Sequence, residues 1–285
     1  MSPLVAIVGP TATGKSSLAL ELCQALNGEI ISADSRQVYR YMDIGTAKPT
    51  KEEQTLVPHH LIDVVNPDEH FSLALYQSKA LEVIEAIRRR EKTALLVGGS
   101  GLYVWALLEG WRIPTVPPNH ALRQKLEARA KSEGGEALYK KLKEIDPVAA
   151  ERIDPKNIRR VIRALEVSLQ GTLFSQLQVK KPFVDSVIIG LTTDRDNLYR
   201  RIDTRVDNMV KKGLVAEVEG LMARGYGFAL PSMSGLGYKQ IGMYLQGKVD
   251  PLTAVQQIKF DTHSFARHQY NWFRLKDKRI NWFEL

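Results

Sequence analysis

The chain has 285 residues and a formal net charge of +8, with 44% hydrophobic and 25% charged residues, which is typical of a globular protein. This length fits one large α/β domain, or a core domain that carries an insertion. No stretch approaches the about 18 consecutive apolar residues of a membrane helix, so we expect no membrane partner. The apolar run Leu4–Val8 is too short for a secretory leader, so we expect a cytoplasmic location. The single cysteine, Cys23, excludes an internal disulfide and a multi-cysteine zinc site.

The positive charge is concentrated in the middle and C-terminal parts of the chain. Residues 1–119 carry a net charge of −2, residues 120–181 carry +6 and residues 182–285 carry +4. A clustered basic excess indicates a polyanionic partner such as nucleic acid, although a surplus of this size also serves solubility. Charge alone therefore leaves both interpretations open.

Short apolar strands alternate with helices along most of the chain, and glycine-rich turns separate them. This alternation predicts a doubly wound parallel sheet. The expected strands and helices, in chain order, are a strand at 4–8, a helix ending near 26, a strand at 29–32, a helix at 73–90, a strand at 93–97, a helix from 102 and a strand at 186–191.

A change of composition divides the chain into three segments. Residues 111–119 contain three prolines and resemble a linker, and residues 120–181 are highly charged with helical periodicity and no clear strand. We therefore predict a P-loop NTPase-like parallel-sheet core with an inserted basic helical domain. The first part of the core is expected at 1–115, the insertion at 116–183 and the completion of the core at 184–285, mainly helical from Asp196 onward.

The first predicted strand leads directly into a phosphate-binding loop. Gly9-Pro10-Thr11-Ala12-Thr13-Gly14-Lys15-Ser16 matches the pattern G-x-x-x-x-G-K-[ST], and a strand precedes it while a helix follows. Glycines let backbone N–H groups curl around a phosphate, and the helix N-terminus adds its positive dipole. Lys15 is expected to reach the terminal phosphate and the Ser16 hydroxyl to hold Mg²⁺. The motif indicates a diphosphate or triphosphate ligand, as in nucleotide-binding and ATP-binding proteins, without choosing among them.

Polar residues follow the next two predicted strands. Asp34 follows the second strand and Ser100 the third, so both are expected at the carboxyl edge of the sheet beside the phosphate loop. From position alone, Asp34 could be catalytic or structural. Neither strand ends in the immediate aspartate of a Walker B strand, which disfavours a motor or a GTPase.

Several motifs together resemble the tRNA dimethylallyltransferase family, also called isopentenyl-diphosphate:tRNA transferases. The similarity spans nearly the whole chain in order and includes Gly9–Ser16, Ile31–Tyr39, Met42–Pro49, Pro58–Asp63, Val97–Tyr103, Arg163–Val167, Gly237–Gln240 and Phe265–Gln269. The chain departs from the family pattern at Ser234-Gly235-Leu236 and at His268. Any side-chain role at Ser234–Leu236 is therefore open.

The resemblance implies an activity and a set of site residues. The enzyme would transfer a dimethylallyl group from dimethylallyl diphosphate to N6 of adenosine 37, next to the anticodon, in tRNAs that read codons beginning with U. Gly9 to Ser16 would hold the diphosphate with Mg²⁺, and Asp34, Lys15 and Ser16 would be catalytic, with Asp34 as the general base. The expected contacts with the tRNA anticodon stem-loop are Asp34, Ser35, Arg36, Gln37, Ser100, Arg123, Arg159, Arg160, Val161, Ile162 and Arg163.

Two other functions compete with this interpretation. A P-loop kinase shares the loop and the aspartate after the second strand, but it does not need a basic insertion and would transfer the γ-phosphate of ATP. A non-catalytic RNA-binding protein would bind tRNA and form no product. We favour the transferase and expect it to act as a monomer, since tRNA supplies the partner surface.

Overall fold

The computed structural model describes residues 3–114, 119–177, 180–182 and 185–285. The chain forms two compact units, of which the first combines Met1–Leu108 with Phe183–Leu285 and the second is Glu109–Pro182. We call the first the core unit and the second the helical unit. The predicted 115/116 and 183/184 boundaries, and residues 115–118 of the proline segment, lie outside the described residues.

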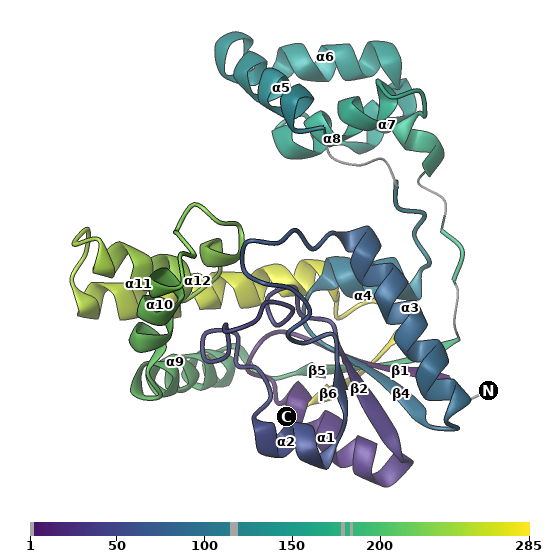
Figure 1. Ribbon diagram of the computed structural model, residues 1–285. Coiled ribbons are helices and arrows are strands. Elements are labelled where there is room, and N and C mark those ends of the chain that lie inside the picture. Colours follow the sequence, from purple (N-terminus) through teal and green to yellow (C-terminus); the bar gives the residue numbers. More distant parts are fainter. Residues whose placement is uncertain (1–2, 115–118, 178–179, 183–184) are drawn as a thin grey trace. The chain divides into compact units, whose positions relative to one another are not determined.

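The core unit is built on a six-stranded sheet in which every strand pair is parallel (Figure 1). The strand order is β3-β2-β4-β1-β5-β6, so the strand before the phosphate loop lies between β4 and β5. Because the strands are parallel, their carboxyl ends meet at one edge, where α/β proteins place their ligands. The strands are β1 (Leu4–Val8), β2 (Gly28–Ser32), β3 (His59–His60), β4 (Thr93–Val97), β5 (Ser186–Thr192) and β6 (Ile280–Glu284).

Helices cover both faces of this sheet. Ala19 and Cys23 of α1 pack against apolar side chains of β1, β2 and β4 on one face, and α3 and α4 lie on the other (Figure 1). The helices of the core unit are α1 (Lys15–Leu26), α2 (Lys51–Leu56), α3 (Leu73–Arg89), α4 (Gly101–Leu108), α9 (Arg195–Lys211), α10 (Leu214–Ala223), α11 (Tyr238–Leu245) and α12 (Pro251–Trp272), with a short 3₁₀ helix η2 at Ser232–Ser234.

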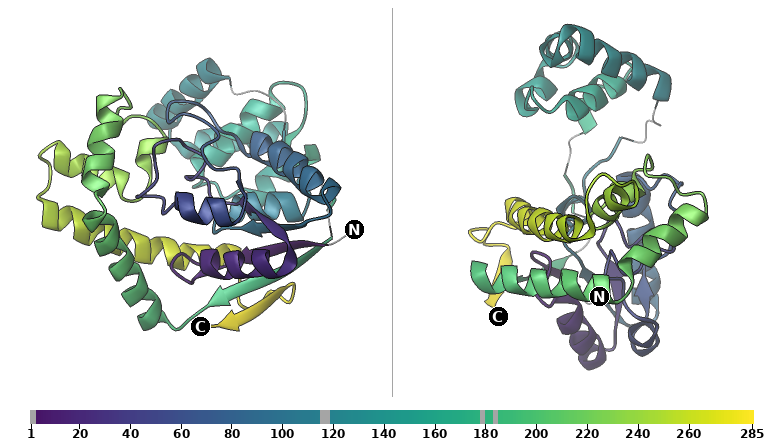
Figure 2. Two further views of the ribbon diagram at one scale, coloured as in Figure 1. Left: turned by 60° about the horizontal axis from the view of Figure 1, so that its bottom comes forward. Right: turned by 90° about the vertical axis from the view of Figure 1, so that its left-hand side faces the viewer.

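The four C-terminal helices form a second hydrophobic cluster beside the sheet. Leu198, Ile202 and Val206 of α9 pack with apolar residues of α10, α11 and α12, and with Val38 and Met42 from the loop after β2. Helices α9 and α12 pack against each other, and Figure 2 shows both of them with α10 and α11 beside the sheet. This packing places one face of α9 against the loop that follows β2.

The α/β core and its predicted strands are confirmed, and helices α9 to α12 confirm the mainly helical character expected from Asp196 onward. The edge strand β6 at Ile280–Glu284, beside β5, was not predicted. The two-residue strand β3 pairs with β2 and was also missed. Both strands lie at the edges of the sheet and are short or largely exposed, so they lack the continuous apolar run of a central strand.

The helical unit has its own hydrophobic core. Its helices are α5 (His120–Glu133), α6 (Gly135–Ile145), α7 (Pro147–Arg152) and α8 (Ile158–Ser168), followed by a 3₁₀ helix η1 (Phe174–Leu177). Asn119, Asp146 and Asn157 cap three of these helices by accepting backbone N–H bonds. The buried residues come from all four α-helices. Among the described residues of either unit, no helix is both long enough and apolar enough to cross a membrane.

An ionic cluster lies at the amino edge of the sheet, where β2 begins. The Glu29 carboxylate is almost completely buried and accepts bonds from His60 Nε2 at 2.7 Å, Arg90 Nη2 at 2.6 Å and Lys92 Nζ at 3.1 Å. Burial opposes the ionisation of Glu29, but the bonds from Arg90, His60 and Lys92 outweigh it and lower its pKa to about 2. Glu29 therefore stabilises the fold only while it carries its charge.

This cluster predicts a pH-dependent difference in stability. The pKa of Glu29 is lower in the folded state than its ordinary value of 4.5, so its contribution is complete above pH 4.5 and is lost as the pH falls toward 2. Glu29→Gln should lower the free energy of unfolding at pH 7 by roughly 1–3 kcal/mol, because the bonds from its three partners to a buried carboxylate are lost or weakened. Urea unfolding from pH 7 to pH 3 should show the two proteins converging as the pH falls. Parallel curves would contradict the assignment.

Candidate active site

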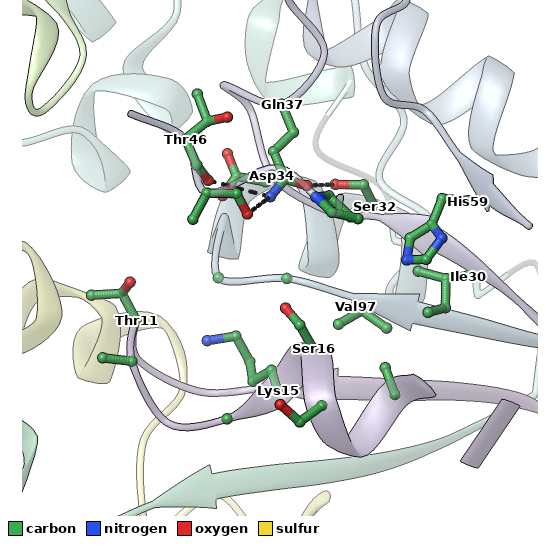
Figure 3. Close-up of a pocket in the computed structure, with 18 of the residues that line it drawn as sticks. Thr11, Lys15, Ser16, Ile30, Ser32, Asp34, Gln37, Thr46, His59 and Val97 are labelled. Atoms are coloured by element: carbon green, nitrogen blue, oxygen red, sulfur yellow. Dashed lines mark hydrogen bonds between the residues drawn. The ribbon is translucent and has the colours of Figure 1, made fainter. Parts of the chain in front are cut away.

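A polar crevice opens at the carboxyl edge of the sheet and has two connected compartments. The first is a cavity of about 250 Å³ between the phosphate loop and the loop after β2, and the second has about 300 Å³ and extends toward η2 and α11. In Figure 3, Lys15 and Ser16 lie across the first compartment from Asp34 and Thr46. The residues that line both compartments are Thr11, Asp34, Thr46, Gly99, Arg205 and Phe265.

The phosphate loop has the tight backbone that its sequence predicts. A Cβ atom at Gly9 would lie 2.3 Å from the carbonyl oxygen of Leu191, so β5 approaches too closely for any other residue. Ala12 and Gly14 have left-handed backbone, with φ of 65° and 79°, and Gly14 caps α1. The loop therefore turns back over the first turn of α1, where backbone N–H groups favour an anion.

Lys15 lies in the crevice in an environment that disfavours its charge. Its Nζ donates to the carbonyl of Pro10. Burial and, to a smaller extent, the nearby Arg205 lower the pKa of Lys15 to about 7, although Asp34 opposes the shift. An anionic ligand would reverse this shift, because it would stabilise the ammonium form.

Asp34 lies in the loop after β2 and faces the cationic side chains of Lys15 and Arg205. One carboxylate oxygen, Oδ1, accepts the backbone N–H of Arg36 at 2.8 Å, which fixes the side chain in an Asx-type turn. Asp34 lines both compartments and interacts electrostatically with Lys15 and Arg205. Its second oxygen, Oδ2, makes no hydrogen bond within the described part of the chain, and is thus placed to accept one from a ligand.

Arg205 of α9 is a site residue that the sequence did not predict. Its side chain lines both compartments and makes no hydrogen bond or ion pair to any described residue. Burial lowers the pKa of Arg205, while Asp34 opposes the shift. Lys15 and Arg205 face Asp34, and Glu53 and Arg36 also line the crevice, so its cations outnumber its carboxylates and it favours an anion.

Side chains from distant segments hold the crevice walls together. Gln269 of α12 accepts the backbone N–H of Thr11 at 2.8 Å and donates to the carbonyl of Gly99 at 3.0 Å. On the opposite wall, the Gln37 side chain accepts from Ser32 Oγ and donates to the carbonyls of Thr46 and Ala47 (Figure 3). The Gln269 bonds link the ends of β1 and β4 to α12, and the Gln37 bonds link the end of β2 to the loop that follows it.

The donor set fits Mg²⁺ held through a bound phosphate. No cluster of three or more His, Cys, Asp or Glu side chains suited to a metal occurs among the residues that the structure describes. The Ser16 side chain lines the first compartment together with Asp34. One hydroxyl with a nearby carboxylate suits Mg²⁺, which keeps several waters and takes further oxygens from substrate phosphates.

The chain matches one protein-family model over most of its length. The model describes IPP transferase and covers residues 37–276. A tRNA dimethylallyltransferase of Herpetosiphon aurantiacus is 55% identical over 98% of this chain and 89% of its own length. A second, from Thermomicrobium roseum, is 50% identical over 99% of this chain and 86% of its own length. The chain belongs to the IPP transferase family.

Solved structures agree with this assignment. The tRNA isopentenylpyrophosphate transferase of Bacillus halodurans has a TM-score of 0.73 at 44% identity, over 100% of this chain and 90% of its own. A eukaryotic dimethylallyltransferase acting on tRNA has a TM-score of 0.82 at 26% identity, over 99% of this chain and 74% of its own. The P-loop NTPase-like core predicted from the sequence is thereby confirmed.

Of the other predicted residues of the core unit, Ser35, Arg36 and Ser100 line the second compartment and Gln37 lines the first. Ser100 Oγ accepts the N–H of Ser35 at 3.0 Å, which joins the loops after β2 and β4. The Arg36 guanidinium donates to the carbonyl of Pro231 at 2.7 Å and also bonds Ser234 Oγ at 3.4 Å. Arg36 therefore anchors the segment that departs from the family pattern.

In the helical unit, two of the predicted RNA contacts are wrong. The side chains of Val161 and Ile162 are 0% and 5% exposed and belong to the hydrophobic core of that unit, so they cannot contact a ligand from solution. Both lie on the apolar face of α8, whereas the neighbouring Arg159 and Arg160 are exposed. Within the stretch 159–163, only Arg159 and Arg160 are therefore fully accessible to RNA.

Arg123 and Arg163 are committed to a buried carboxylate. Glu166 is fully buried and accepts two bonds from Arg123, at 3.0 and 2.9 Å, one from Arg163 and one from the N–H of Asn119. These bonds oppose the desolvation of Glu166 and lower its pKa. Arg123 thus joins α5 to α8, and Arg163 pairs with Glu166 within α8, so both have a structural role beside the predicted RNA contact.

The low pKa of Lys15 predicts proton uptake when a diphosphate binds. At pH 7 about half of the Lys15 side chains are neutral, and a bound anion should restore the ammonium form. Calorimetry with inorganic diphosphate in buffers of different ionisation enthalpy should show uptake rising from about half a proton at pH 7 toward one at pH 8.5. The same measurement on Lys15→Arg, whose guanidinium stays charged, gives the proton change that comes from the diphosphate alone. Equal uptake by both proteins would disprove the low pKa.

The Glu166 network predicts which arginines stabilise the helical unit. Arg123→Ala should cost about 1–3 kcal/mol of stability, because it leaves the buried carboxylate without its bidentate partner. Arg159→Ala is the matched control and should change stability by less than about 0.5 kcal/mol. Thermal unfolding followed by circular dichroism measures both. Equal melting temperatures would show that the Arg123 pair does not stabilise the unit.

Proposed function

We propose that this protein transfers the dimethylallyl group of dimethylallyl diphosphate to N6 of adenosine 37 in the tRNA anticodon loop, in tRNAs that read codons beginning with U. The observation that carries the proposal is the placement of Asp34 opposite Lys15 and Arg205 in one crevice. The cations suit a diphosphate leaving group and the carboxylate suits a proton acceptor. Family membership supports the choice of donor and acceptor.

The donor binds in the first compartment. Residues Gly9 to Ser16 offer backbone N–H groups and the Lys15 ammonium to the diphosphate, and Arg205 adds a second positive charge from α9. Ser16 Oγ would hold Mg²⁺, whose positive charge would help to neutralise the diphosphate. These contacts strengthen as charge develops on the leaving group, which is how a site stabilises a transition state.

The adenine reaches Asp34 from the second compartment. The lone pair of N6 forms a bond to C1 of the dimethylallyl group while the bond from C1 to oxygen breaks, and the electron pair of that bond leaves with the diphosphate. Because the donor carbon is allylic, its developing positive charge is delocalised. Asp34 accepts the proton that N6 loses. The base must leave the loop stack for this reaction, which single-stranded loops allow at low cost.

The helical unit supplies phosphate contacts to the anticodon stem. Its segment 120–181 carries a net charge of +6, and the exposed Arg159 and Arg160 are its best-placed members on α8. Removing one phosphate contact should reduce, by about one, the slope of the logarithm of the binding constant against the logarithm of the salt concentration. We expect the protein to act as a monomer in the cytoplasm.

Replacing Asp34 tests this mechanism. Asp34→Asn keeps the bond to the Arg36 N–H but cannot accept the proton, so turnover should fall roughly 10²–10⁴-fold while RNA affinity changes little. The assay uses purified protein, Mg²⁺, labelled dimethylallyl diphosphate and an unmodified anticodon stem-loop, with labelled ATP in a parallel tube. Asp68→Asn, an exposed residue of the same type, is the matched control.

Three outcomes decide the proposal. Label in the RNA without phosphate transfer from ATP supports the prenyl transfer. ATP turnover stimulated by a small acceptor, with no label in the RNA, overturns it in favour of a kinase. Undiminished turnover in Asp34→Asn rejects Asp34 as the base and leaves the transfer itself standing.

A further inference from the structure

One carboxylate of α10 collects four hydrogen bonds from a loop and a helix that line the crevice. Glu217 Oε2 accepts the backbone N–H groups of Asp43 at 2.9 Å and Ile44 at 2.7 Å. Its Oε1 accepts the N–H of Gly45 at 3.0 Å and the hydroxyl of Tyr238 at 2.6 Å. Three successive N–H groups that converge on one anion form the kind of concavity that proteins use to bind anions. Here the anion is part of the protein.

The loop held by Glu217 has little regular structure of its own. At the two ends of this loop, Tyr41 and Ala47 have left-handed φ angles of 65° and 46°, which non-glycine residues rarely adopt. The side chain of Asp43 pairs with the buried Lys48. The backbone N–H groups of residues 43–45 donate to Glu217. Such backbone persists only where surrounding contacts determine it.

The same bonds shape the second compartment of the crevice. Gly45 and Tyr238 both line this compartment, and a Cβ atom on Gly45 would lie 2.5 Å from the Tyr238 ring. Thr46, the next residue, lines both compartments together with Asp34. Glu217 is absent from the described lining of both, so it acts on the site only through the residues it holds.

We propose that Glu217 is a positioning residue that sets the Gly45–Tyr238 wall of the second compartment, against which the acceptor base lies beside Asp34. This inference rests on the proposed function. It concerns the RNA acceptor more than the donor, because Gly45 and Tyr238 line the second compartment and not the first.

Only a carboxylate of this length satisfies the four groups. Burial and the neighbouring Glu217 raise the pKa of Tyr238, so its phenol stays protonated and donates. Both oxygens therefore face donors. A glutamine would place its NH₂ group against at least one backbone N–H in either orientation, since each oxygen accepts at least one of them. An aspartate is one methylene shorter and cannot span the same distance.

The test compares Glu217→Gln with Glu219→Gln, which makes the same substitution on an exposed residue of α10. Hydrogen exchange followed by mass spectrometry should show faster exchange of the peptide covering residues 42–48 in Glu217→Gln only. In the transfer assay, kcat/KM for the RNA should fall on the order of 10²-fold, because small displacements at a reacting centre have effects of this size. The KM for dimethylallyl diphosphate should stay within a few-fold of wild type.

Tyr238→Phe provides a second variant in case Glu217→Gln does not fold. It removes one donor and leaves the three backbone bonds, so exchange at residues 42–48 should rise less and the RNA kinetics should change in the same direction by a smaller factor. Faster exchange together with a selective loss for the RNA supports the inference. Unchanged exchange, or faster exchange with unchanged kinetics, overturns it.

The two proposals fail in different ways. A wild-type protein that transfers no dimethylallyl group overturns the proposed function. Exchange at residues 42–48 would still decide whether Glu217 holds the loop, since that readout does not depend on activity.

Discussion

Lys15 and Arg205 are held, partly buried, in one crevice in which cations outnumber carboxylates. Like charges in such a place repel, and burial disfavours each of them, as the lowered pKa values show. The free energy of folding elsewhere must hold them there. A ligand with two phosphate groups relieves this conflict, so the same arrangement that destabilises the empty site favours the charged donor and its leaving group.

The surrounding structure keeps these charges in place with bonds between distant parts of the chain. Gln269 ties the phosphate loop to the end of β4, Arg36 ties the loop after β2 to η2, and Glu217 ties the next turn to α10 and α11. Each bond joins a loop at the carboxyl edge to the C-terminal helices. The parallel sheet brings the loops to one edge, and the bonds to the C-terminal helices fix the position of each loop there.

The sequence predicts the parts of this site that depend on local spacing. The phosphate loop follows from residues adjacent in the chain, and the position of Asp34 follows from the end of a strand. Arg205 could not be predicted, because α9 contains several arginines and only its packing against α12 decides which one faces the crevice. Glu217 has no motif, since its partners are backbone N–H groups about 170 residues away.

The errors have equally specific physical causes. Val161 and Ile162 stand between arginines in the sequence, yet their spacing to Leu165 places all three on the apolar face of one helix. Helical periodicity in α8 was therefore sufficient to exclude them as RNA contacts. Strand β6 was missed because it is a mostly exposed edge strand of five residues in which Asn281 and Glu284 interrupt the apolar run that marks a buried strand.

The helical unit begins and ends with chain segments that pair with each other. Trp111 and Lys180 form an antiparallel bridge, the N–H of Lys181 donates to the carbonyl of Gly110, and Lys180 pairs with Glu109. Once the helical unit has formed, its two ends are held together. The folding core then has to close only this short paired segment, between α4 and β5. Loop closure then costs far less entropy than a free segment of that length would impose. The same paired segment makes the position tolerant of exchange, so helical units of different length or charge can be acquired over evolution without altering the register of the sheet.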